Sequence, residues 1–197
     1  NDNIAIGYDA MTTNTAGGTL NLAVGNYALD ALTSGDYNVA LGHGTLTANT
    51  TGATNTAIGN SALEDNTTGS DNTAIGGYAL ATNTTADANT AIGRRAMQLN
   101  TTGTSNVALG YEALKTNTTA NNNTAIGAYS LQVNTTGAQC TAVGQSSMQQ
   151  NTTGANNIAV GKNAMLANTT GTRNIAIGNT AYDASDTEND NLAIGHQ

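Results

Sequence analysis

Apolar residues recur along this chain at a fixed interval, and each recurrence ends in a glycine. The block Asn-x-Ala-aliphatic-Gly occurs twelve times, with its Ala and Gly invariant and its Asn replaced once, by Cys140. From Gly25 onward these marker glycines are 17 residues apart, and Gly7 precedes Gly25 by 18. A period of this length indicates one short structural unit stacked on copies of itself. The marker glycines are Gly7, Gly25, Gly42, Gly59, Gly76, Gly93, Gly110, Gly127, Gly144, Gly161, Gly178 and Gly195.

The apolar positions within a repeat indicate strands rather than helices. A representative repeat, residues 59–75, reads G-N-S-A-L-E-D-N-T-T-G-S-D-N-T-A-I. The N-T-A-I segment predicts one strand, and the A-L-x-x-N-T-T segment predicts a second short strand and a corner. We therefore expect an all-β fold, a parallel β-solenoid or β-roll of about twelve 17-residue coils. It would form a single repeat domain over residues 1–197 and a rod on the order of 55 Å long.

Each constant position of the repeat indicates a structural requirement. The marker Gly predicts a positive φ or a close backbone approach after the strand, and the block Ala predicts space for one methyl group. We expect the aliphatic residue between them, such as Ile58 or Ile75, to lie inside the coil. A second interior rank is predicted four residues after the glycine, where Leu or Met recurs. The stacked block asparagines predict a hydrogen-bonded ladder that Cys140 interrupts once.

Composition narrows the class of protein. The chain has 197 residues, of which 38% are hydrophobic and 4% aromatic, and it has no Phe, Trp or Pro. Each coil has few apolar side chains to bury, so we expect homo-oligomerisation along the rod axis to cover one apolar rank. A net charge of −8 with five basic residues argues against nucleic-acid binding. No apolar run approaches the length of a transmembrane helix. Because the chain starts within a repeat, we expect it to be a fragment of a longer fibre.

Residues able to do catalysis or bind metal are sparse. His43 and His196 lie in distant coils, with no carboxylate or thiol at metal or triad spacing. Cys140 has no neighbouring activator, and we interpret it as a small buried filler. An acidic cluster within residues 183–190 lacks the EF-hand spacing and is interpreted as a solvated terminal coil. We predict no catalytic residue, no metal and no cofactor. The cluster comprises Asp183, Asp186, Glu188 and Asp190.

Tyrosines recur at one corner of the repeat, one or two residues after the marker glycine. Exposed Tyr is favourable contact surface for sugars and proteins, and it can equally fill a corner and shield the backbone. The possible ligand-contact residues of this corner are Tyr27, Tyr78, Arg95, Tyr111 and Tyr129.

The tripeptide Asn-Thr-Thr recurs in most coils and is formally an acceptor for N-glycosylation. Alternatively, Asn-Thr-Thr is simply the sequence that forms a corner of each coil. We favour the second interpretation because sugars at every coil, about 4.8 Å apart, would crowd one another. These tripeptides begin at Asn49, Asn66, Asn83, Asn100, Asn117, Asn134, Asn151 and Asn168.

The repeated block resembles the head repeats of trimeric autotransporter adhesins, which carry a similar N-S-V-A-I-G block. The likeness recurs in all twelve blocks, for example at residues 55–59, 72–76 and 123–127, although the repeats here are longer than the adhesin repeat of about 14 residues. The N-T-T-G segment is also similar to repeats of phage-tail-fibre-like surface proteins. The resemblance implies a left-handed β-roll, three chains side by side, and adhesion at a cell or virion surface. It also implies an extracellular location, on an outer-membrane-anchored fibre or a virion fibre.

These residues suggest three candidate functions: an adhesive fibre, an enzyme and an ice-binding protein. The leading hypothesis is a structural and adhesive fibre segment that attaches to a cell-surface glycan or protein receptor. Its Leu/Met rank or its Ala rank would face the trimer axis, and its tyrosine corner would meet the target. An enzyme on a β-helix is disfavoured because Glu64, Glu112 and Glu188 lie coils apart and at different coil positions.

The alternative to adhesion is ice binding by ranks of Thr on a flat face. Two Thr ranks on one face need a T-x-T spacing, whereas this repeat offers T-T, and adjacent strand residues point to opposite faces. The ranks in question include Thr67, Thr84, Thr101, Thr118 and Thr135, with their neighbours Thr68, Thr85, Thr102, Thr119 and Thr136.

Overall fold

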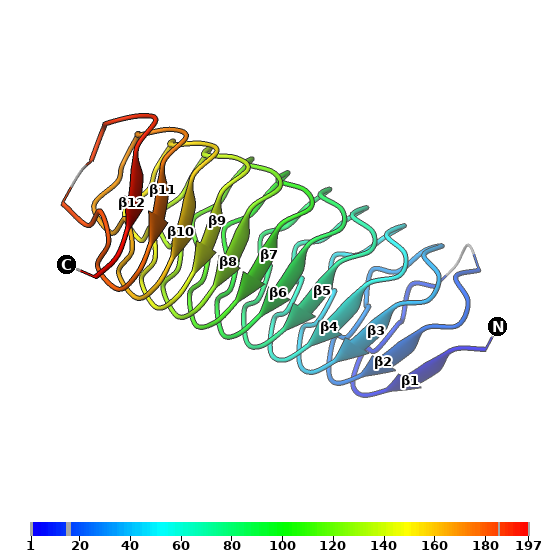
Figure 1. Cartoon of the computed structure of the whole chain (residues 1–197). Helices are drawn as coiled ribbons and strands as arrows, with labels where there is room; N and C mark the ends of the chain where they lie inside the picture. Colours follow the sequence, from blue (N-terminus) through cyan, green and yellow to red (C-terminus); the bar gives the residue numbers. More distant parts are fainter. Residues whose placement is uncertain (1, 15–16, 185, 197) are drawn as a thin grey trace.

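The computed structural model is a rod built from one parallel sheet and the turns that connect its strands (Figure 1). It describes residues 2–14, 17–184 and 186–196. The strands are β1 (Ile4–Ile6), β2 (Leu22–Val24), β3 (Val39–Leu41), β4 (Thr56–Ile58), β5 (Thr73–Ile75), β6 (Thr90–Ile92), β7 (Val107–Leu109), β8 (Thr124–Ile126), β9 (Thr141–Val143), β10 (Ile158–Val160), β11 (Ile175–Ile177) and β12 (Leu192–Ile194).

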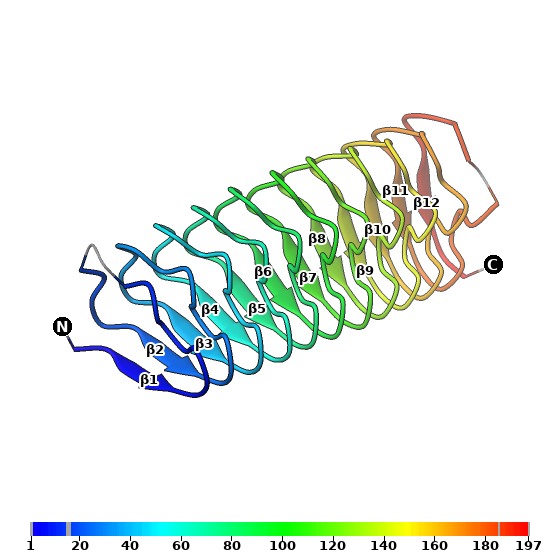
Figure 2. The same cartoon turned by 180° about the vertical axis from the view of Figure 1, so that it is seen from behind.

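The strands lie in chain order, and each pairs in parallel with the next. Equivalent residues of successive coils are opposite one another, so Ala74 pairs with Ala91 and Ile75 with Ile92. Seen from behind, the rest of each coil returns across the rod, and the two termini lie at opposite ends (Figure 2). The predicted parallel β-solenoid is therefore confirmed, with about eleven turns and a 17-residue spacing.

The second strand predicted for each coil is wrong. Within the described residues, the A-L-x-x-N-T-T segments form turns rather than strands. In each coil the backbone enters the left-handed region at several non-glycine residues, for example Glu112 (φ 53°) and Leu114 (φ 51°). The chain therefore bends tightly instead of running straight. Its backbone still bonds to the next coil, because the Leu114 N–H donates to the Ser130 carbonyl at 2.9 Å.

Left-handed backbone explains why one interior rank contains Leu and Met but not Ile or Val. A β-branched residue at positive φ is a steric outlier, and even an unbranched residue there costs about 1–2 kcal/mol. In nine consecutive coils this rank has φ between 49° and 55° and its side chains are fully buried. We call it the Leu/Met rank, and it comprises Leu29, Leu46, Leu63, Leu80, Met97, Leu114, Leu131, Met148 and Met165.

The strand residue that faces the inside of the coil is alanine in every strand. Ala74, Ala91 and Ala108 are 0% exposed, whereas their strand neighbours point outward. The expectation that the aliphatic residue before the marker Gly lies inside is therefore wrong: Leu109 is 46% and Ile126 37% exposed. Successive strand residues face opposite sides of a sheet. With Ala facing the interior, both of its neighbours must face outward.

Two ladders of asparagine run through the interior. In the first, the Asn72 backbone N–H donates to Asn55 Oδ1 at 3.0 Å, and Asn55 Nδ2 donates to the Gly69 carbonyl at 2.8 Å. In the second, Asn100 Nδ2 donates to Asn83 Oδ1 at 2.9 Å. These side chains are buried, and the amides pair polar groups that would otherwise be costly to bury. The predicted ladder of block asparagines is confirmed.

The marker glycines satisfy both of the requirements predicted for them. Gly110 has φ of +138°, and a Cβ added there would lie 2.6 Å from the Gly127 carbonyl carbon. Gly103, in the other turn, has no such φ, and alanine already occupies its equivalent in the two neighbouring coils, as Ala86 and Ala120. A Cβ at Gly103 would also meet backbone, the Ala120 carbonyl oxygen at 2.4 Å. Gly110 is thus required by conformation and by contact, whereas Gly103 is restricted by contact alone, at a position where neighbouring coils carry alanine.

Replacing Gly110 by Ala is expected to lower the free energy of unfolding by more than about 2 kcal/mol, because the new Cβ meets backbone and strains φ. The matched variant Gly103→Ala is expected to cost less than Gly110→Ala, because its new Cβ also meets backbone but its φ is not strained, and the neighbouring coils already carry alanine there. Urea unfolding followed by circular dichroism measures both. Equal losses would contradict the distinction between the two glycines.

Cys140 interrupts the first ladder. Its backbone N–H donates to Asn123 Oδ1 at 2.9 Å and its thiol to the Gly154 carbonyl at 3.3 Å, but it offers no amide oxygen to the Asn157 N–H. Burial raises the pKa of the thiol to about 11.

We expect Cys140→Asn to restore the missing hydrogen bond of the first ladder and raise the free energy of unfolding by about 1 kcal/mol. Cys140→Ala, which restores nothing, is the control and should destabilise. A destabilised Cys140→Asn variant would contradict the ladder geometry.

Candidate interaction surfaces

The outer side of the parallel sheet is a flat face with two outward ranks. One rank is the residue before the strand Ala, which is Thr or aliphatic, and the other is the aliphatic residue after it. We call these two ranks together the sheet face. Its first rank comprises Ile4, Leu22, Val39, Thr56, Thr73, Thr90, Val107, Thr124, Thr141, Ile158, Ile175 and Leu192. Its second comprises Ile6, Val24, Leu41, Ile58, Ile75, Ile92, Leu109, Ile126, Val143, Val160, Ile177 and Ile194.

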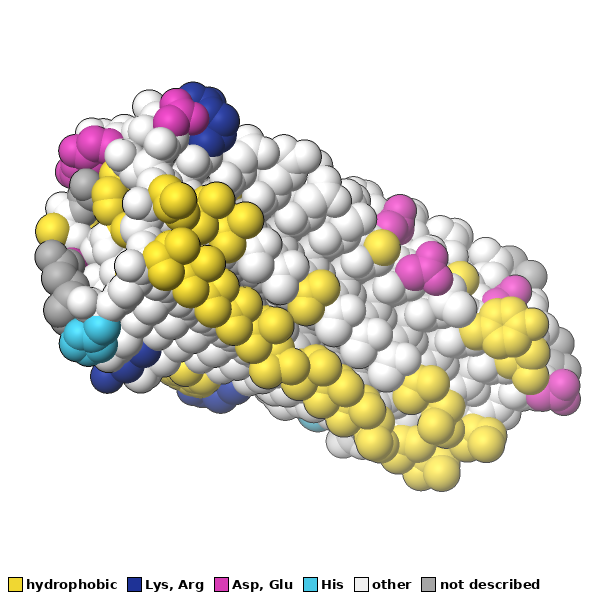
Figure 3. Space-filling model, in the orientation of Figure 1, with side chains coloured by type: hydrophobic (Ala, Val, Ile, Leu, Met, Phe, Trp, Pro, Cys, Tyr) yellow, Lys and Arg dark blue, Asp and Glu magenta, His cyan; other side chains and the backbone are white. Residues whose placement is uncertain are grey.

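The sheet face is uncharged along its whole length, and its second rank is aliphatic in every strand. Figure 3 shows the aliphatic residues of this face as a hydrophobic stripe that follows the rod from one end to the other. No Asp, Glu, Lys or Arg occurs in either rank. Twelve strands about 4.8 Å apart, each with two outward residues, give the whole sheet face, its Thr positions included, a footprint on the order of 500 Å². That lies at the upper end of the contiguous apolar patches that monomeric proteins expose, about 300–600 Å².

The sheet face was not the surface expected to meet a partner chain. The Leu/Met rank or the Ala rank was expected to face the partner chains. Both ranks are 0% exposed through most of the rod, as at Leu114 and Ala108, and they pack against each other inside the coil. A partner chain cannot reach them, so this expectation is wrong.

The tyrosine corner is divided along the rod rather than forming one stripe. Tyr111 and Tyr129 pack edge to face, with ring centroids 5.3 Å apart. Tyr27 belongs to a separate group near the N-terminal end, where its ring centroid lies 5.6 Å from those of Tyr8 and His43. Of the five predicted contact residues, Tyr27, Tyr78 and Tyr111 are between 37% and 39% exposed, and Arg95 and Tyr129 are half-buried.

Glu112 organises the middle of this corner, and the sequence analysis did not identify it as a contact residue. Its carboxylate is 3.3 Å from Arg95 Nη1 and 3.2 Å from Lys115 Nζ, and Gln132 Nε2 donates to it at 2.7 Å. The side chain is 8% exposed. Burial raises the pKa of this carboxyl, but the surrounding hydrogen bonds outweigh burial and lower the pKa below its usual value. The available sequence signal was the 17-residue separation between Arg95 and Glu112, which stacks them in adjacent coils.

The Thr ranks differ from each other in what their hydroxyls contact. In the first rank, the Thr67 hydroxyl donates to the Thr84 carbonyl at 2.9 Å and the Thr101 hydroxyl to the Thr118 carbonyl at 2.9 Å. In the second rank, Thr68 and its equivalents are exposed. Only one of the two ranks therefore presents its hydroxyls outward, which leaves a narrow row rather than a broad Thr face.

The Asn-Thr-Thr asparagines lie inside the rod. Asn66 is 0% exposed, and its Nδ2 donates to both Asn49 Oδ1 and the Gly69 carbonyl, each at 2.9 Å. A sugar on Nδ2 would remove a ladder hydrogen bond and require space that the packed interior lacks. This geometry supports the interpretation that the tripeptide forms a corner of the coil rather than a glycosylation site.

The other chemically reactive residues do not converge. His43 lies beside Tyr27, and His196 lies near the opposite end of the rod. In the acidic cluster Asp190 pairs with Arg173 through two contacts of 2.6 and 2.8 Å. Among the described residues, no group of three His, Cys, Asp or Glu side chains is arranged to hold a metal ion. The described part of the chain also contains no helix that could cross a membrane.

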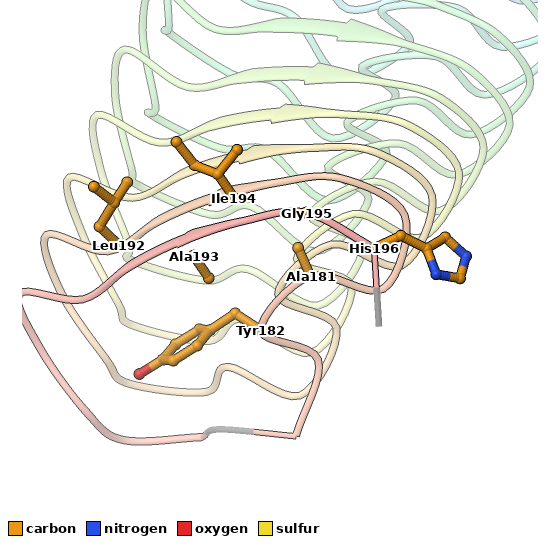
Figure 4. A pocket seen from close by; sticks show the side chains of 7 residues that line it. All are labelled: Ala181, Tyr182, Leu192, Ala193, Ile194, Gly195 and His196. Carbon is orange, nitrogen blue, oxygen red and sulfur yellow. The ribbon is translucent and has the colours of Figure 1, made fainter.

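A hollow of about 470 Å³ opens at the C-terminal end of the rod. Figure 4 shows Leu192 and Ile194 pointing to one side of β12, whereas Ala193 points to the other side, toward the Tyr182 ring. Tyr182 occupies the coil position that holds Leu or Met in the preceding coils. The hollow is thus the interior of the last coil seen from its open end, and its lining follows the same inward and outward alternation as the rest of the sheet.

Replacing Glu112 by Gln is expected to lower the free energy of unfolding at pH 7 by about 1–2 kcal/mol, because its donors lose a charged acceptor. The lowered pKa of Glu112 means that this contribution is present above the unfolded-state pKa, about 4.3, and is lost as pH falls through the folded-state pKa. The difference between wild type and variant should therefore shrink in acid. Urea unfolding at pH 7 and pH 3 measures it, with Glu64→Gln as the control. A difference that acid leaves unchanged would contradict the role of the carboxylate charge.

Comparisons of the chain with protein-family models, with curated proteins and with solved structures gave no match. What these surfaces bind is therefore inferred from their own residues.

Proposed function

We propose that this chain is a structural and adhesive segment of a surface fibre, in which three copies lie side by side and cover one another's sheet faces. The number of copies follows the resemblance to trimeric adhesin heads. The observation that carries the proposal is the continuous uncharged face formed by the outward ranks of all twelve strands. Leaving this stripe in water forgoes roughly 25 cal/mol for each Å² that a partner could cover.

The period of the sheet face favours another copy of this chain as its partner. Its side chains repeat at the spacing of paired strands, about 4.8 Å. A second rod with the same coil spacing presents a matching row at every step, so contacts can be equivalent along the full length. A stable interface buries roughly 800 Å² per partner, and the sheet face supplies on the order of 500 Å² of that area.

Adhesion is the second part of the proposal. A rod of about eleven turns holds its corners at a regular distance from the sheet face, and the corners vary in sequence from coil to coil. The exposed tyrosines and the Arg95–Glu112–Lys115 group are the variable polar surface that would meet a glycan or protein receptor. An extracellular location on a cell or virion surface follows from this role.

Ice binding remains the competing proposal. A flat sheet with regular outward rows is the feature that favours it, and β4, β5 and β6 each present an outward Thr beside an aliphatic residue. Against it, the predicted Thr pair presents only one exposed rank, and the sheet face is largely aliphatic. Thermal hysteresis of the purified chain measures this activity directly.

The oligomer is tested by light scattering after size exclusion, for which three copies of the 19.7 kDa chain predict about 59 kDa. The double variant Leu109→Asp, Ile126→Asp is expected to run near the mass of a monomer because it buries two carboxylates in the interface. The control Thr102→Asp alters an exposed turn residue and should keep the wild-type mass. Circular dichroism checks that the variants stay folded.

Two results would overturn this assignment. A wild-type monomer would remove the interface, and thermal hysteresis in that sample would then favour ice binding. A double variant that keeps the wild-type mass would show that copies associate through another surface.

A further inference from the structure

Basic residues gather at one point of an otherwise acidic rod. Three of the five cations of the chain, Arg94, Arg95 and Lys115, lie in two consecutive coils. Arg95 and Lys115 share the carboxylate of Glu112, whereas Arg94 is exposed and forms no ion pair within the described residues. Three cations and one carboxylate leave this corner with a formal charge of +2, although the whole chain carries −8. Such a local reversal of sign attracts anions.

Hydrogen bonds between coils bring these residues to the same corner. The Glu112 N–H donates to the Arg94 carbonyl at 3.1 Å, and the Arg95 N–H donates to the Gly77 carbonyl at 3.0 Å. Tyr78 stands one coil before Arg95 at the same coil position, and it is 39% exposed. An aromatic ring and two guanidinium groups therefore occupy adjacent coils of one edge.

Gly77 leaves an opening beside them. A Cβ at Gly77 would find its nearest heavy atom, the Asn60 carbonyl oxygen, at 3.9 Å, and Gly77 has no positive φ that would require glycine. Its neighbour Gly76, in contrast, has φ of +132°. The backbone would accept a side chain at Gly77, as it accepts Asn60 at the equivalent position of the preceding coil. Because Gly77 has no side chain, the approach to Tyr78 is clear.

We propose that Gly77, Tyr78, Arg94 and Arg95 form a binding site for a carboxylated sugar. A guanidinium binds a carboxylate through two parallel hydrogen bonds, and a tyrosine ring offers an apolar surface with a polar tip to the sugar ring. Arg94 is the free cation for this contact. Glu112 holds Arg95 in position through Nη1. The site rests on the proposed adhesive function, because it assigns a ligand class to the corner of that fibre.

The corner adjoins the sheet face without being part of it. The marker glycine turns the chain away from the sheet before Gly77 and Tyr78 are reached. Figure 3 shows basic side chains at the lower edge of the rod, separated from the hydrophobic stripe by uncoloured polar surface. Copies of the chain can therefore cover the stripe while this edge still meets a sugar.

Calorimetric titration of the wild-type chain tests the site with two carboxylated probes, sialyllactose and trigalacturonate, and with lactose as the neutral comparison. We expect at least one carboxylated probe to bind with a Kd below about 1 mM, with affinity that falls as salt rises, and no detectable binding of lactose. Failure of both carboxylated probes, or equal binding of lactose, would overturn the proposal.

Substitutions at Gly77 and Arg94 test where on the rod the sugar binds. Gly77→Asn fills the opening with the residue that the preceding coil already has there, and it is expected to weaken binding at least about ten-fold, as is Arg94→Gln. The matched control Ala128→Asn places the same side chain at the same coil position three coils away and should leave Kd unchanged. Unchanged binding in Gly77→Asn, with its circular dichroism spectrum preserved, would show that the sugar binds elsewhere.

The same samples separate this site from the proposed oligomer. Light scattering gives the mass, and titration gives the affinity. A monomer that binds the carboxylated probe would reject the trimer and keep the site, whereas a trimer that binds neither probe would reject the site and keep the trimer.

Discussion

The structure depends on one interaction, the hydrogen bonding of each coil's backbone to the coils on either side, with equivalent residues 17 apart from β2 onward. The pairing continues beyond the strands, because left-handed residues such as Leu114 also donate to the next coil. A fixed offset places identical residues above one another, so every position of the repeat becomes a rank along the rod. The marker glycines permit this close stacking, since a Cβ at Gly110 would meet the next backbone. The asparagine ladders then satisfy the polar groups that stacking buries.

Stacking also determines which residues are free to act. Interior ranks must suit a narrow coil, so the strand contributes Ala and the opposite turn contributes Leu or Met. The outward aliphatic residues have no function inside the coil, yet they are retained in all twelve strands. A repeated feature that the single rod does not need is best explained by a repeated contact outside it. The sheet face is for this reason the centre of the proposed assembly.

Specificity has to come from positions where the repeat varies. A receptor that met only the invariant ranks would find every coil alike. Gly77, Arg94 and Glu112 interrupt the pattern at one corner, and together they combine an opening, a free cation and a buried carboxylate. Cys140 also interrupts the pattern, but it does so inside the ladder, where its effect is on stability rather than on recognition.

The parallel solenoid, its period, the asparagine ladder with its break at Cys140, and the conformational role of the marker glycines could all be predicted from the amino-acid sequence. Each of these follows from residue types recurring at a constant interval. Which side of each strand faces inward could not be predicted in this way, because it depends on how the coil folds. In a Thr-Ala-Ile strand, either the Ala or the Thr and Ile can face the inside of the coil. Which of them does so depends on how closely the returning turn approaches the strand. Left-handed residues bring that turn so near that only a methyl group fits, which sends Ile outward. The grouping around Glu112 was hidden for a similar reason, because Arg95, Lys115 and Gln132 meet only when three coils are stacked.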